Sequence, residues 1–152
     1  MTGALVVGLG QRDRGDGGAG PAVADRVASL GLPGVTVIER DDPAALLAEW
    51  HGPELVVVAD AVRSGQAPGT VQMLHPAHGP LPGWTGPGGS HAFGLADAVE
   101  LARTLQQLPP CLVIVGVEAE QFRPGEPLSA QVAAAIEPAA QTVASVVRSV
   151  QP

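Results

Sequence analysis

A glycine-rich loop near the start of the chain places the strongest constraint on the fold. The apolar run at residues 4–7 leads into residues 8–20, which hold six glycines and two aspartates. Pro21 then opens a stretch with apolar residues at helical spacing, so the pattern predicts strand, loop and helix. Glycine lets a backbone turn tightly or approach a bound group, and ligands bind at the carboxyl ends of parallel strands. We therefore expect this loop to be part of a functional site.

The loop does not fit the common phosphate-binding motifs. Asp13 occupies the place of the third glycine of a dinucleotide-binding fingerprint, and the chain has no lysine for a Walker loop. The net charge of -7 disfavours nucleic acid and anionic membranes as partners. Carboxylates in such a loop suit a cation instead.

The remaining apolar patterns predict an α/β protein. Strands are expected at residues 4–7, 35–38, 55–59, 70–74 and 111–117, and helices at residues 21–30, 44–50, 93–102 and 129–150. The short run at 70–74 has no helix before it and is expected to be an antiparallel edge strand. This order predicts one domain over residues 1–152, a three-layer α/β/α fold with a mostly parallel, twisted five-stranded sheet.

The composition also bears on the compartment. One cysteine, Cys111, forms no internal disulfide, and the first residues lack the pattern of an export signal. The longest apolar runs fall far below the roughly 20 residues that span a bilayer. We expect a cytoplasmic protein that does not insert into membranes.

Acidic residues follow three of the predicted strands and would gather at one edge of the sheet. Together with a histidine from the long glycine- and proline-rich segment at 76–90, they suit a divalent metal ion that keeps open positions. For most of them, helix capping or solvation is the simpler interpretation. Asp60 is the exception, because it ends a buried apolar strand, where a carboxylate requires a partner. These residues are Asp13, Asp16, Asp60, His91, Glu118 and Glu120.

Four segments of the chain resemble those of the nickel–iron hydrogenase maturation proteases. They contain Gly8-Leu9-Gly10-Gln11 with 15–21, Asp60-Ala61, the segment 90–95 around His91, and Val115 to Phe122 with Leu128-Ser129 beyond it. The order and spacing match along nearly the whole chain. The resemblance implies a twisted, mostly parallel sheet flanked by helices. It also implies a metal site made by an acidic residue of the first loop, an aspartate and a histidine.

The aspartate and the histidine of that site correspond to Asp60 and His91. The family usually has two adjacent acids in the first loop, the second being the ligand, whereas this chain reads Asp16-Gly17. Asp16 is our candidate for the missing ligand, because the glycines beside it make a backbone shift easy. We therefore predict Asp16, Asp60 and His91 as metal-binding and catalytic residues.

The resemblance implies an endopeptidase that removes the C-terminal extension of a nickel-loaded hydrogenase large-subunit precursor. The nickel would be supplied by that precursor, and another divalent metal is a further option. Polarisation of the carbonyl by the metal, a metal-bound hydroxide, or a carboxylate base could each drive hydrolysis. The alternative, suggested by Gly17, is a catalytically silent relative that binds the precursor as a maturation factor. A third hypothesis is an unrelated ligand-binding α/β domain. Trp84 is a candidate contact for the client protein, whereas Trp50 is expected in the core.

Overall fold

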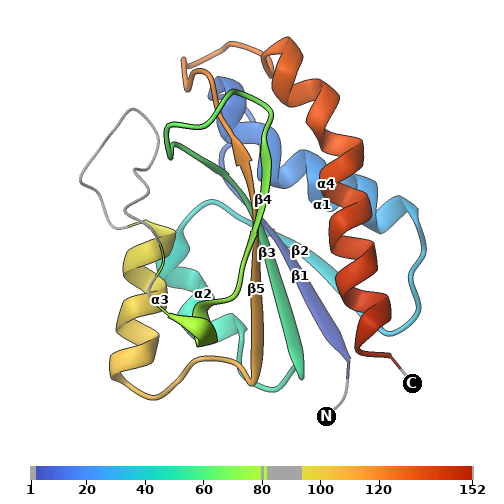
Figure 1. Cartoon of the computed structure of the whole chain (residues 1–152), viewed down its shortest axis with the longest axis vertical. Helices are drawn as coiled ribbons and strands as arrows, with labels where there is room; N and C mark the ends of the chain where they lie inside the picture. The colour runs from blue at the N-terminus through green and yellow to red at the C-terminus, as the bar shows by residue number, and fades with distance from the viewer. Residues whose placement is uncertain (1–2, 80, 82–93, 152) are drawn as a thin grey trace.

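A twisted five-stranded sheet forms the centre of the protein (Figure 1). The computed structural model describes residues 3–79, 81 and 94–151. The strand order is β2-β1-β3-β5-β4, with β4 antiparallel to β5 and the other pairs parallel. This confirms the predicted sheet and its antiparallel edge strand. The strands are β1 (Ala4–Leu9), β2 (Val35–Arg40), β3 (Leu55–Val62), β4 (Val71–Leu74) and β5 (Cys111–Glu118).

Helices cover both faces of the sheet, as the three-layer prediction requires (Figure 1). One face packs against α1 (Ala19–Ser29) and α4 (Ala130–Ser149), and the other against α2 (Leu46–Glu49) and α3 (Leu95–Thr104). Three short 3-10 turns complete the fold: η1 (Gly15–Gly18), η2 (Pro43–Ala45) and η3 (Pro76–His78). Across the described residues, no helix is long and apolar enough to cross a membrane.

The alternation of side chains along β3 decides which face the candidate site residue occupies. Val57 and Ala59 pack in the core under α1 and α4, whereas Val56 and Val58 pack in the core under α2 and α3. Because successive side chains of a strand point to opposite faces, Asp60 lies on the α2/α3 side. Trp50 is buried in that second core, as predicted.

Several predicted boundaries differ from the structure. The predicted third strand ended at residue 59, but pairing with β5 continues to Val62, so Asp60 lies inside β3 opposite Gly116. The predicted helix at 44–50 is only the η2 turn and one turn of α2, with the Asp42 side chain accepting from the Ala44 N–H at 2.9 Å. The helix α4 contains Pro138 and continues through it as one element.

Candidate functional site

The first loop turns sharply at Gly10, which lies directly against the backbone of Gly17. A Cβ on Gly10 would stand 2.1 Å from the Gly17 carbonyl oxygen, and the φ of Gly10 is +148°. The Gln11 N–H donates to that same carbonyl at 2.9 Å, and the Gly10 N–H donates to the Arg40 carbonyl at 2.9 Å. The loop is therefore closed on itself and tied to the end of β2, at the carboxyl edge of the sheet.

Asp16 points into the segment that joins β5 to α4. Its side chain is fully buried, and its carboxylate accepts from the N–H groups of Glu120, Gln121 and Ser129 at 2.8, 3.1 and 2.7 Å. The hydroxyl of Ser129, the residue before α4, donates to Asp16 at 2.9 Å and makes no capping hydrogen bond to the helix. With four hydrogen bonds, this carboxylate has its lone pairs in use. The geometry favours a structural role for Asp16 over the ligand role expected from the sequence.

Gly17, like Gly18 after it, differs from Gly10 and Gly20 in having space for a Cβ. A Cβ there would meet the Gln11 carbonyl oxygen at 3.3 Å, the Arg14 Cβ at 3.5 Å and the Phe122 ring at 3.6 Å. The backbone of Gly17 is also outside the left-handed region. A larger residue would need shifts of only a few tenths of an ångström, so the absence of an acid here is not forced by the backbone.

Asp60 is a half-buried carboxyl group at the carboxyl edge of the central strand. Burial raises the pKa of Asp60 to about 8, and a hydrogen bond from the Ala61 backbone N–H offsets only part of this effect. Within the described residues, none of the ion pairs involves Asp60. A carboxyl group in such surroundings stays protonated near neutral pH until a cation compensates its charge.

His91 lies outside the described residues, as do Ser90 and Trp84, so the predicted meeting of Asp60 and His91 is not tested here. The helix α3 begins at Leu95, four residues after His91, and covers the face of the sheet on which Asp60 lies. In the described part of the chain, no group of three or more His, Cys, Asp or Glu side chains could hold a metal ion.

The acidic residues after β5 have separate roles. Glu118 is 3% exposed, and its carboxylate accepts from the Ser64 N–H at 3.0 Å and the Ser64 hydroxyl at 2.5 Å, with the Gln72 amide at 3.5 Å. It fixes the loop between β3 and β4. Glu120 is exposed, and its carbonyl oxygen accepts from the Arg63 guanidinium. These contacts do not bring the Glu118 or Glu120 side chain to Asp60.

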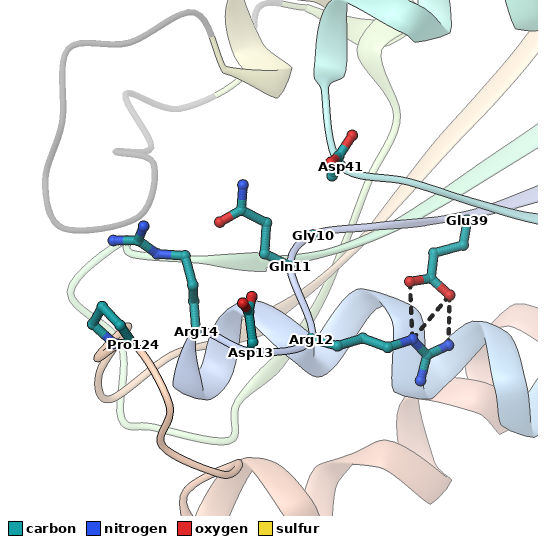
Figure 2. Close-up of a pocket in the computed structure, with 8 residues that line it drawn as sticks. All are labelled: Gly10, Gln11, Arg12, Asp13, Arg14, Glu39, Asp41 and Pro124. Atoms are coloured by element: carbon teal, nitrogen blue, oxygen red, sulfur yellow. Dashed lines mark hydrogen bonds and ion pairs between the residues drawn. The ribbon is translucent and has the colours of Figure 1, made fainter.

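A groove of about 450 Å³ opens at the first loop, and we call it the first-loop groove (Figure 2). It is lined by residues 10–14, Glu39, Asp41 and Pro124. The sequence analysis placed Asp13 at this edge but gave Arg12 and Arg14 no role. Two arginines within three residues, in a chain with only eight basic residues, were the available signal.

Comparisons with known proteins agree with this architecture. A sequence model described as hydrogenase maturation protease matches residues 34–146. The chain is 34% identical to the hydrogenase 2 maturation protease of Escherichia coli over 104 residues, 68% of this chain and 63% of that relative, so the match spans less than two thirds of the relative's length.

Solved structures give the same assignment. The hydrogenase-maturating endopeptidase HybD of E. coli superposes with a TM-score of 0.72 and 27% identity, covering 97% of this chain and 93% of that one. An endopeptidase from E. coli solved in solution gives a TM-score of 0.78 and 28% identity over the same shares. The chain belongs to the hydrogenase maturation protease family.

Proposed function

We propose that this protein is an endopeptidase that removes the C-terminal extension of a nickel-loaded hydrogenase large-subunit precursor. Family membership supports the reaction class, and relatives of this fold are described as endopeptidases. The observation that carries the proposal is Asp60, a carboxyl group with a pKa raised to about 8 at the carboxyl edge of the central strand. A cation bound beside such a group stabilises its ionised form.

In this proposal the nickel belongs to the client, and the protein contributes Asp60 and His91 as ligands. Asp60 must lose its proton to bind a cation, so binding is expected to release a proton and to strengthen as the pH rises toward about 8. Hydrolysis then adds water across the scissile peptide bond: the hydroxyl joins the carbonyl carbon and the proton goes to the leaving amine. Because Gly17 has no side chain to act as a ligand, one coordination position of the nickel is left for a group of the client.

The direct test incubates the purified protein with nickel-loaded precursor and detects the released C-terminal peptide by mass spectrometry. We expect cleavage, none with a nickel-free precursor, and loss of cleavage in Asp60→Asn. Glu137→Gln is the matched control, because it makes the same acid-to-amide change on the exposed surface of α4. Tight binding of the precursor without cleavage would instead support the silent maturation factor.

The residue at position 17 offers a second test. Gly17→Glu has space for the Cβ of the new side chain and is expected to raise the affinity for free Ni²⁺, measured by calorimetry, by about 10-fold or more, the scale of losses seen when metal sites are altered. Gly17→Gln has the same shape without the charge and should gain much less. Equal affinities for these two variants and the parent protein would mean that position 17 does not face the metal.

A further inference from the structure

The first-loop groove carries one arginine, Arg14, that has no ion-pair partner among the residues the structure describes. Arg12 is engaged twice: its guanidinium binds Asp25 at 2.8 Å and also bonds Glu39 (Figure 2). In the described part of the chain, the ion pairs involve Arg12, Arg26, Arg40 and Arg103, and none involves Arg14. The Nε of Arg14 is buried and has no hydrogen-bond partner there. An unpaired buried donor costs free energy. We take its presence in the free protein to indicate a ligand that pairs with it.

The other free charges of the groove are negative. Asp13 and Asp41 are exposed, line the groove, and form no ion pair with described residues. Figure 2 shows Arg14 and Pro124 on one side of the groove, and Asp41 on the other, with Gln11 between them. The groove is therefore polarised, with the Arg14 guanidinium at one end and the Asp41 carboxylate at the other, while Asp13 lies beside Arg14 (Figure 2).

The groove also begins where the proposed reaction would occur. Pairing between β1 and β3 ends at Gly8 and Ala59, so the chain leaves β1 directly beside Asp60. From there the loop turns toward the end of β2, which supplies Glu39 and, just beyond it, Asp41. The first loop, whose residues 10–14 line the groove, therefore starts at the strand end next to Asp60.

We propose that the first-loop groove binds an extended segment of the client polypeptide in one direction, with a carboxylate against Arg14 and a basic side chain against Asp41. This rests on the proposed function for the identity of the client. An arginine guanidinium matches a carboxylate with paired, charge-assisted hydrogen bonds. The reverse direction places like charges together at both ends and is rejected. The carboxylate comes from an acidic side chain or from a chain terminus.

The test measures peptide binding, which does not depend on cleavage. The probe is an N-acetylated, C-amidated peptide in which Glu precedes Lys, separated by glycine spacers of varied length. It is compared with the reversed order, with Gln in place of Glu, and with a peptide whose only carboxylate is its free C-terminus. Titrations are followed by NMR of the labelled protein, whose amide spectrum also verifies that each variant is folded.

We expect one orientation of the probe to bind, and Arg14→Gln to weaken it about 10-fold, the loss of one charge-assisted contact. Arg148→Gln removes the same charge from an exposed position on α4 and should bind like the parent protein. Asp41→Asn should weaken only peptides that carry Lys. Comparison of the Glu peptide with the peptide whose only carboxylate is its free C-terminus shows whether an acidic side chain or a chain terminus binds Arg14.

Equal binding of both orientations, or unchanged binding in Arg14→Gln, would overturn the proposal. Directional peptide binding with no cleavage of the nickel-loaded precursor would leave the groove assignment standing and refute the peptidase function. Cleavage that is unaffected by Arg14→Gln, together with no peptide binding, would support the peptidase function and refute the groove assignment.

Discussion

Asp16 joins the first loop to the segment before α4 by accepting four hydrogen bonds, and its removal tests this role. Asp16→Ala would leave three backbone N–H groups without their charged acceptor. Hydrogen bonds to charged groups contribute about 1.5–3 kcal/mol each, and these donors are only partly buried, so we expect the free energy of unfolding to fall by about 2–4 kcal/mol in urea titrations. Asp13→Ala, an exposed aspartate of the same loop, should change it by less than about 0.5 kcal/mol. Equal stability of the two variants would refute the structural role.

Asp60 predicts how the stability of the metal-free protein depends on pH. Its pKa is about 8 in the folded protein against 3.8 ordinarily, so between these values the folded state holds one more proton than the unfolded state. The free energy of unfolding therefore falls as the pH rises through this window, by up to about 1.4 kcal/mol per pH unit. Asp60→Asn lacks the titrating group and should lose this component. A stability difference between parent and variant that stays constant from pH 4 to pH 8 would contradict the prediction.

At the scale of elements, the connection between β3 and β4 depends on a buried carboxylate of β5. Glu118→Ala would remove the acceptor of the Ser64 N–H and hydroxyl. We expect the unfolding free energy to fall by about 2 kcal/mol, and the Ser64 amide to exchange with solvent faster, measured by hydrogen exchange. Glu120→Ala, two residues on and exposed, is the control and should alter neither quantity.

The elements themselves were predictable where their apolar periodicity was local. All five strands and the antiparallel edge followed from short apolar runs. The helix expected at 44–50 shrank because Pro43 begins a 3-10 turn and only four residues follow in helix. The end of β3 was misjudged because Asp60 looks like a strand terminus in sequence, while its pairing with Gly116 depends on a strand more than 50 residues away.

At the scale of the whole molecule, one exposed cation links three elements. Arg12 of the first loop binds Asp25 of α1 and Glu39 of β2, and the guanidinium beside Asp25 holds the pKa of that carboxyl below its usual range. Arg12→Ala is expected to lower the unfolding free energy by about 1 kcal/mol or less, because all three side chains are exposed. The loss should shrink in concentrated salt, measured by urea titration at two ionic strengths. A loss independent of salt would mean that packing of the arginine, not its charge, is responsible.

The site was less predictable than the fold, because its contacts also join residues that are far apart in the sequence. The sequence located Asp60 by its place after a buried strand, but it could not find the partners of Asp16, which lie 104 to 113 residues further along. The role of Arg14 depends on which neighbours leave it unpaired, and that is decided by the folding of the loop. His91 stays a prediction.

The hydrogen bonds from Ser129 to Asp16 also set the order in which this protein is completed during synthesis. The first loop leaves the ribosome early, but the groups that hold Asp16 emerge only after more than a hundred further residues have been translated. Until then a glycine-rich segment with a bare carboxylate has no partner to fix it. A nascent chain interrupted before residue 129 therefore lacks the hydrogen bonds that fix the first loop in place.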